Sequence, residues 1–134
     1  MLSLFIKAAL AGESPVIYGD GEQTRDFTYI DNVVDGVLRA TEAPDAVGEV
    51  INVATGGCVS LNQAWATLST ILGPLPAPLH ESARVGDVRA SQADIVKAEL
   101  LLGYRPHVMF EEGLLRTANW ADSASVANSN STTL

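Results

Sequence analysis

Apolar residues recur at helical spacing in several stretches of the chain, and short β-prone runs lie between some of them. In the first stretch, Phe5, Ile6 and Ala9 follow the spacing of an amphipathic helix, which Gly12 is expected to end. The predicted helices cover residues 1–11, 31–43, 61–72, 94–102 (with Asp94 as its cap) and 111–121, and the predicted strands cover 16–18, 25–30 and 49–54. This mixture predicts a small α/β fold.

The length and the polar C-terminus define the expected domain organisation. The chain has 134 residues, which is enough for one domain with a usable core. Residues 123–134 are rich in Ser, Asn and Thr, a composition typical of a disordered tail. We therefore expect one folded part at 1–122 and a tail at 123–134.

Composition argues against several classes of function. The net charge of −8 disfavours nucleic acid as a partner, because nucleic-acid binding depends on clustered Lys and Arg. No apolar run approaches the roughly 18 residues that span a membrane, so no membrane partner is predicted. The single cysteine, Cys58, excludes an internal disulfide and fits a reducing cytoplasm. His80 and His107 lack ligand spacing with each other and with Cys58, so no metal site is predicted.

Two stretches are more specific than composition can explain. Residues 16–34 are VIYGDGEQTRDFTYIDNVV, residues 84–94 are RVGDVRASQAD, and EVINVATGG stands between them at 49–57. In this order they resemble the C-terminal half of NAD-dependent sugar-nucleotide epimerases and dehydratases of the extended short-chain dehydrogenase/reductase family, most closely UDP-hexose and UDP-hexuronate 4-epimerases. The resemblance covers roughly residues 3–121. It implies the C-terminal substrate-binding portion of a Rossmann-type fold that lacks the N-terminal dinucleotide-binding half.

The resemblance implies a UDP-sugar as ligand and a role for five residues. Arg25 and Arg84 match the two arginines that hold the diphosphate, a task that suits the permanently charged, bidentate guanidinium group. Asp87 matches the carboxylate that accepts hydrogen bonds from the ribose hydroxyls, and Val16 and Tyr18 match positions whose main chain pairs with the uracil edge.

Each of these residues also has a simpler structural interpretation. Surface ion pairs between an arginine and a neighbouring carboxylate are common and contribute little. The alternatives are an Arg25 pair with Asp26 or Asp31, an Arg84 pair with Glu81, a turn cap at Asp87 and an ordinary edge strand at residues 16–19. Taken together and in order, the residues favour the nucleotide site.

Two motifs of the family's chemistry have no counterpart in these residues. The glycines never form the G-x-G-x-x-G or G-x-x-G-x-x-G turn that binds a dinucleotide. A Tyr-x-x-x-Lys pair is also missing, because the lysines, Lys7 and Lys97, are preceded four positions earlier by Ser3 and Ala93. Without that tyrosine the chain has no family base for hydride transfer. The intact family enzyme uses NAD, and we predict no catalytic residue and no NAD motif in this chain.

A missing half would also have structural consequences. In the family, the strand equivalent to 49–54 joins the sheet of the cofactor domain, and the helix at 31–43 packs near it. That helix has Val33, Val34, Val37 and Leu38 on the side expected to be buried. Without the partner, an apolar face and an unpaired strand edge are expected.

The predicted function is the UDP-sugar-binding portion of an NAD-dependent 4-epimerase, an isomerase, inactive when alone. One alternative is a subunit of a split enzyme, completed by a chain that carries the N-terminal cofactor-binding half. Another is a non-catalytic binding or interaction module. A further alternative concerns the reaction, because dehydratases and reductases of the same superfamily share this plan.

Overall fold

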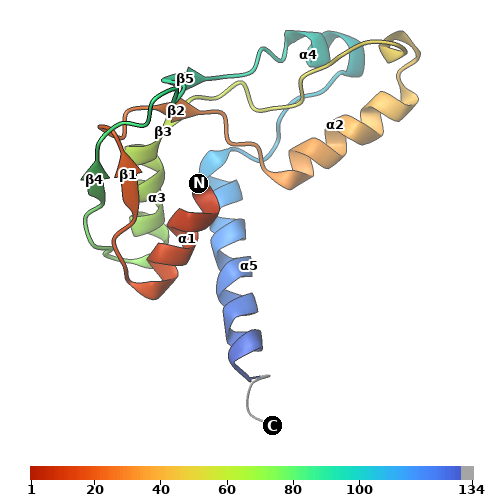
Figure 1. Cartoon of the computed structure of the whole chain (residues 1–134). Coiled ribbons are helices and arrows are strands. Elements are labelled where there is room, and N and C mark those ends of the chain that lie inside the picture. Colours follow the sequence, from red (N-terminus) through yellow and green to blue (C-terminus); the bar gives the residue numbers. More distant parts are fainter. Residues whose placement is uncertain (131–134) are drawn as a thin grey trace. The chain divides into compact units, whose positions relative to one another are not determined.

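The computed structural model describes residues 1–130, with side chains through residue 124, and these residues form two compact units (Figure 1). Unit 1 comprises residues 1–22, 61–87 and the chain from Leu114 onward. Unit 2 comprises residues 23–60 and 88–113. The candidate nucleotide-binding residues predicted from the sequence are divided between these units, with Arg25 in unit 2 and the other four in unit 1.

Unit 1 combines helices with a two-stranded parallel sheet. Its helices are α1 (Leu2–Ala11), α3 (Leu61–Leu72) and, from Leu114 onward, α5 (Phe110–Asn130); its strands are β1 (Val16–Tyr18) and β4 (Leu79–Glu81). The register pairs Ile17 with His80. Helix α1 packs on α3 through Phe5 and Trp65, whose rings meet edge to face with centroids 5.7 Å apart. As predicted, Gly12 ends α1, in the left-handed region that glycine tolerates, at φ +67°.

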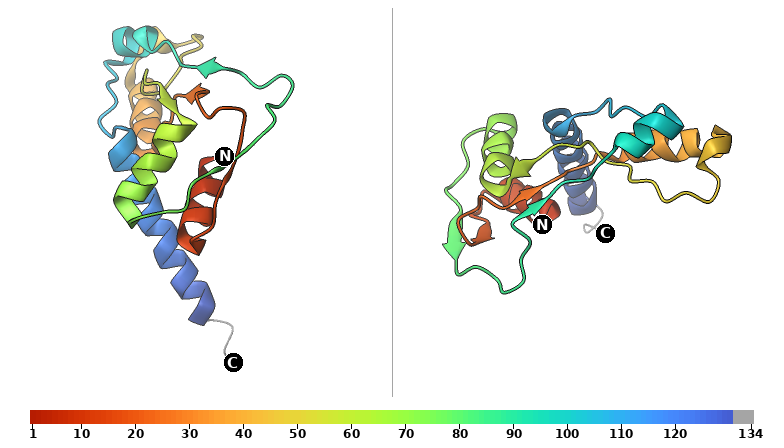
Figure 2. Two further views of the ribbon diagram at one scale, coloured as in Figure 1. Left: turned by 90° about the vertical axis from the view of Figure 1, so that its left-hand side faces the viewer. Right: turned by 90° about the horizontal axis from the view of Figure 1, so that it is seen from above.

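Unit 2 is built around a three-stranded sheet with the order β3-β2-β5. Strand β2 (Thr24–Arg25) is central, antiparallel to β3 (Val59–Ser60) and parallel to β5 (Ala90–Ser91). The helices are α2 (Ile30–Glu42), the short 3₁₀ helix η1 (Pro44–Ala46), α4 (Val96–Leu102) and the first turn of α5. Helix α4 lies beside α2 (Figure 2). A cluster of buried residues, Ala98, Leu102 and Tyr104, forms the core here.

The buried face of α2 differs from its apolar side, which the sequence predicts to be left uncovered when the partner half is missing. Val34, Val37 and Leu38 are 48%, 57% and 60% exposed, whereas Asn32 and Gly36 are buried. Gly36 explains part of the difference, because a Cβ there would meet the Val53 side chain at 2.6 Å. The helix therefore turns its small and amide side chains inward and leaves an apolar stripe at the surface of unit 2.

Three further predictions differ from the structure. Of the strand predicted at 25–30, only Arg25 lies in a strand, β2 (Thr24–Arg25), and Ile30 begins α2. Residues 49–54 form no strand among the described residues, and Val50 is 86% exposed. A strand requires a neighbour to share its ladder, and within the described residues no strand pairs with this segment. Helix α5 continues through 123–130 of the segment for which the sequence predicts a disordered tail. The last four residues of that segment, 131–134, lie outside the described residues.

Candidate functional site

Strand β1 presents one edge to β4 and turns the other away. The carbonyl of Pro15 and the N–H of Gly19 bond to β4 at 2.9 and 2.8 Å. Because backbone groups alternate along a strand, those of Val16 and Tyr18 point to the opposite edge. Ile17, only 1% exposed, anchors the strand in the core. Positions 16 and 18 therefore have their main-chain donors and acceptors on the edge of β1 that faces away from β4.

The predicted phosphate and ribose residues lie at the two ends of one turn. The N–H of Asp87 donates to the carbonyl of Arg84 at 3.2 Å, which closes the turn over Val85 and Gly86. Gly86 has φ +84°, and the third position of a type II turn needs such a positive value. Both Arg84 and Asp87 are exposed. The turn that the simpler interpretation expects at Asp87 is therefore present, and the main chain of Asp87 closes it.

Arg84 stacks on an aromatic ring of the same unit. Its guanidinium carbon lies 3.7 Å from the centroid of the Tyr18 ring, well within the range of a cation–π contact. Within residues 1–124, whose side chains are described, the Arg84 side chain has neither a hydrogen bond nor an ion pair, so the alternative pair with Glu81 is not formed. Unit 1 thus joins β1 to the turn that carries the predicted phosphate-binding arginine.

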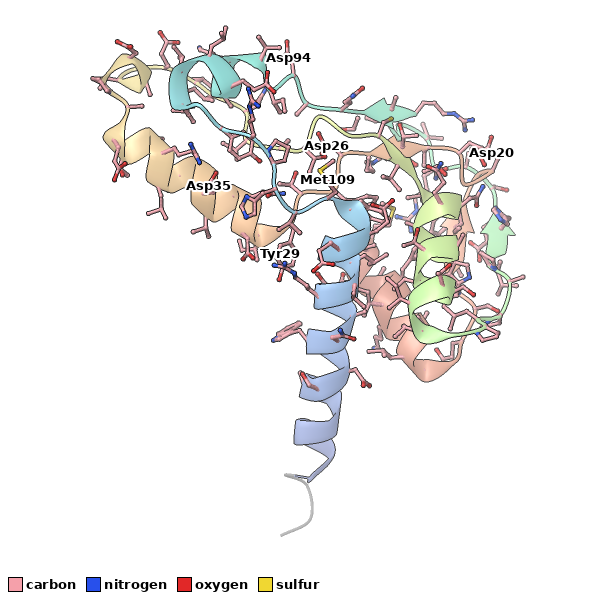
Figure 3. The ribbon with its side chains drawn as sticks, turned by 180° about the vertical axis from the view of Figure 1, so that it is seen from behind. Asp20, Asp26, Tyr29, Asp35, Asp94 and Met109 are labelled. Carbon is pink, nitrogen blue, oxygen red and sulfur yellow. The ribbon has the colours of Figure 1, made fainter. Side chains whose placement is uncertain are left out.

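The turn that follows β1 is fastened to the start of α3. Asn62 donates through Nδ2 to the carbonyl of Asp20 at 2.9 Å and to the carboxylate of Glu22 at 2.6 Å. Its own N–H donates to the carbonyl of Gly21 at 3.1 Å. Asp20, labelled in Figure 3, sits between two glycines with positive φ. These bonds fix the chain just beyond Tyr18.

Arg25 belongs to unit 2, whereas the other four predicted residues belong to unit 1. It lies on the central strand β2, where its Nη1 donates to the carbonyls of Thr24 and Val88, both at 2.7 Å. These bonds give the arginine a structural role within its own unit. A role in phosphate binding stays a prediction from the family resemblance.

Asp26, which the sequence analysis did not single out, joins three segments of unit 2 (Figure 3). Its carboxylate accepts from the N–H and hydroxyl of Thr55 at 3.1 and 2.5 Å, from the N–H of Gly56 at 2.9 Å and from that of Ala93 at 3.4 Å. Within the described side chains it forms no ion pair with Arg25, so the Arg25–Asp26 pair offered as one alternative is not formed. Asp26 fixes the chain immediately after Arg25.

Two more polar residues tie unit 2 together from within its core. Asn32 is fully buried; its Oδ1 accepts from the N–H groups of His107 and Val108, both at 3.0 Å, and its Nδ2 donates to the carbonyl of Val108 at 2.6 Å. The hydroxyl of Tyr104 donates to the carbonyl of Ala54 at 2.8 Å. Burial raises the pKa of Tyr104 above its usual range, and the charges of two nearby aspartates, at 35 and 26, raise it further. Tyr104 is therefore held as a neutral donor.

Among the described residues, no group of three or more His, Cys, Asp or Glu side chains is arranged to hold a metal ion. No helix within this part of the chain combines the length and the apolar character needed to cross a membrane.

The chain is similar in sequence to a known protein family and to individual proteins. Residues 1–54 match the sequence profile of the NAD dependent epimerase/dehydratase family. A protein described as a putative UDP-glucose 4-epimerase from Methanocaldococcus jannaschii is 35% identical over 120 residues, which are 90% of this chain and 38% of that protein.

Solved structures agree with the family match. UDP-glucose 4-epimerase from Thermotoga maritima, crystallised with UDP-glucose, is similar with a TM-score of 0.86 and 39% identity, over 92% of this chain and 40% of that one. A variant of UDP-glucuronic acid 4-epimerase from Bacillus cereus, in complex with UDP-4-deoxy-4-fluoro-glucuronic acid and NAD, gives a TM-score of 0.85 and 33% identity, over 92% and 40% of the two chains.

These findings confirm the resemblance predicted from the sequence: the chain is similar to NAD-dependent sugar-nucleotide epimerases and shares an α/β fold with part of them. It spans about two fifths of the length of these relatives, 38% of the first and 40% of the two solved chains. The similarity therefore describes a portion of an enzyme of this kind.

Proposed function

We propose that this chain is the UDP-sugar-binding portion of an NAD-dependent sugar-nucleotide 4-epimerase. The observation that carries the proposal is the arrangement in unit 1, where the outer edge of β1 and the Arg84–Asp87 turn are joined by the Tyr18 stack. A strand edge offers alternating donors and acceptors to a uracil, and a guanidinium offers paired donors to a diphosphate. These are the two ends of a uridine diphosphate.

Each predicted residue has a task in this proposal. The main chain at Val16 and Tyr18 pairs with uracil, Asp87 accepts from the ribose hydroxyls, and Arg84 binds the diphosphate. Arg25 is the second arginine that the family resemblance implies, and the variant Arg25→Ala tests its contribution. The binding portion corresponds to residues 1–122.

The cofactor and the catalytic base belong outside these residues in this proposal. The sequence has no Tyr-x-x-x-Lys pair and no glycine-rich dinucleotide turn. NAD and the base would come from the remainder of a longer chain or from a second chain that carries the N-terminal half. NAD would then supply hydride removal and return at the sugar carbon, and this portion would hold the nucleotide in place. The single, exposed Cys58 favours the cytoplasm as the compartment.

The proposal is tested by calorimetric titration of the purified chain with UDP, UDP-glucose and uridine. Replacing Arg84 by alanine removes a charged hydrogen-bond donor worth about 1.5–3 kcal/mol, so UDP binding is expected to weaken about 10- to 100-fold. Uridine lacks the phosphates, and its affinity is expected to be the same in both proteins. Arg25→Ala, assayed in the same way, tests the second arginine.

Arg105→Ala is the matched control, because it removes the same charge from an exposed position. It is expected to leave UDP binding unchanged. A wild-type chain that does not bind UDP, or an Arg84→Ala variant that binds it as well as the wild type, would contradict the proposed role.

A further inference from the structure

Arg84 lies on an exposed turn and yet has a defined place. Its described contact is the Tyr18 ring, and within the described side chains it has no other polar partner. A long side chain on a surface turn has high rotamer entropy and would ordinarily sample many orientations. The guanidinium group stacks on the Tyr18 ring, so the position of the guanidinium is defined in the ligand-free chain.

The ring itself is held by the strand. Tyr18 is the last residue of β1, whose neighbour Ile17 is almost fully buried and whose following residue, Gly19, donates to Glu81 of β4. Side chains alternate along a strand, so Tyr18 faces away from the core side that Ile17 occupies. Tyr18 has two side-chain torsions, which makes it a rigid base compared with the arginine.

Stacking also determines which part of the guanidinium remains available. The group is planar, and its N–H donors lie in the plane, so a ring over one face leaves the donating edges open to phosphate. Arg25 is the contrasting case, because its Nη1 already donates hydrogen bonds to two main-chain carbonyls. A stacked arginine is therefore better prepared to bind a diphosphate than an arginine bound through its edge.

The surrounding charge gives the stack a second effect. The chain carries a net charge of −8, and Glu81 and Asp87 stand three residues before and after Arg84. An arginine released from the ring would meet one of these carboxylates and lose its donors to an ion pair. The cation–π contact with Tyr18 competes with that outcome.

We propose that Tyr18 is a positioning residue for Arg84: its ring holds the guanidinium in the orientation that binds the diphosphate of the nucleotide. This role rests on the proposed function and adds a side-chain task to a position for which the family resemblance implies a main-chain contact. The positioning role predicts that the Tyr18 ring affects the affinity for UDP only through Arg84, and that a phenylalanine ring positions Arg84 equally well.

The first test uses the ligand-free chain. A stacked arginine feels the ring current, so the side-chain protons of Arg84 are expected at unusually high field in the NMR spectrum of the wild type and of Tyr18→Phe. The shift is expected to disappear in Tyr18→Leu. Ordinary shifts for Arg84 in the wild type would overturn the proposal without reference to any nucleotide.

The second test is an NMR titration with UDP of four proteins: wild type, Tyr18→Leu, Arg84→Ala and the double variant. Tyr18→Leu is expected to raise the Kd about two- to five-fold, the equivalent of an exposed cation–π contact. Tyr18→Phe is expected to bind like the wild type. In the Arg84→Ala background, Tyr18→Leu is expected to have no further effect.

The outcomes separate the two proposals. Equal weakening by Tyr18→Leu with and without Arg84 would mean that the ring acts on the base directly, which overturns the positioning role. An unchanged Kd in Tyr18→Leu overturns it as well. A wild type that keeps the high-field shift but binds no UDP overturns the proposed function, and the positioning role is lost with it.

Discussion

Replacing Asn32 by alanine removes three hydrogen bonds from the core of unit 2. The variant leaves the N–H groups of His107 and Val108 and the carbonyl of Val108 without their partner at a fully buried position. Each unsatisfied buried group costs about 1–3 kcal/mol. The lower end applies to the partly buried His107 amide, which water can reach. The higher helix propensity of alanine recovers at most about 0.7 kcal/mol, so unit 2 is expected to lose roughly 3–5 kcal/mol.

The assay must report on unit 2 alone, because both tryptophans, Trp65 and Trp120, lie in unit 1. Amide hydrogen exchange meets this requirement, because the protection of the amides in α2 and α4 gives the free energy of opening of unit 2. Tryptophan fluorescence in urea follows unit 1 in the same samples. Asn52→Ala is the matched control, since the exposed Asn52 makes a single described bond of 3.3 Å to the carbonyl of Asp94. Equal and small losses of protection in both variants would refute the assignment of Asn32 as an anchor of unit 2.

Two further predictions concern other contacts of the two units. Gly21→Ala is expected to destabilise unit 1 by roughly 2–4 kcal/mol, because φ is +78° and the new Cβ would lie 2.1 Å from Asn62 Oδ1. The control is Gly12→Ala, which has a similar φ but open space around the new Cβ, so it carries only the backbone cost. Equal urea midpoints for the two variants would contradict the clash with Asn62. The raised pKa of Tyr104 means that its contribution to stability is complete below the unfolded value near 10 and is lost as the pH rises from there through the folded-state pKa. Tyr104→Phe is expected to flatten this alkaline loss of exchange protection, and a wild-type slope equal to that of the variant would show that the tyrosine is not responsible.

The helices were predictable because their signals are local. The 3.6-residue spacing of apolar side chains and the glycines at 12 and 103, which end α1 and α4 with positive φ, need no information from distant residues. Asp94, predicted as the cap of α4, lies one residue before the N-cap, Ile95, and its carboxylate accepts from the N–H of Val96 at 2.9 Å. The strand predicted at 49–54 is a different case, because β-propensity alone does not supply the neighbouring strand.

The site was predictable in its residue types and not in its geometry. Arg84 and Asp87 are three residues apart, so their shared turn follows from local sequence, whereas the stack of Arg84 on Tyr18 joins residues 66 positions apart. Asp26 and Asn32 were missed because their partners lie 29 to 76 positions away. A signal for Asn32 was present in the sequence, since it stands four residues before Gly36 and shares its helix face.

The most direct test of the central claim is a two-dimensional amide NMR spectrum of the wild-type chain recorded without and with UDP. The proposed function predicts dispersed peaks in both spectra and ligand-dependent shifts concentrated at residues 16–18 and 84–87. The same addition is expected to leave the peaks of an Arg84→Ala variant nearly unmoved at equal UDP concentration. A dispersed spectrum that does not respond to UDP, or shifts confined to other parts of the chain, would contradict the claim that unit 1 binds a uridine nucleotide.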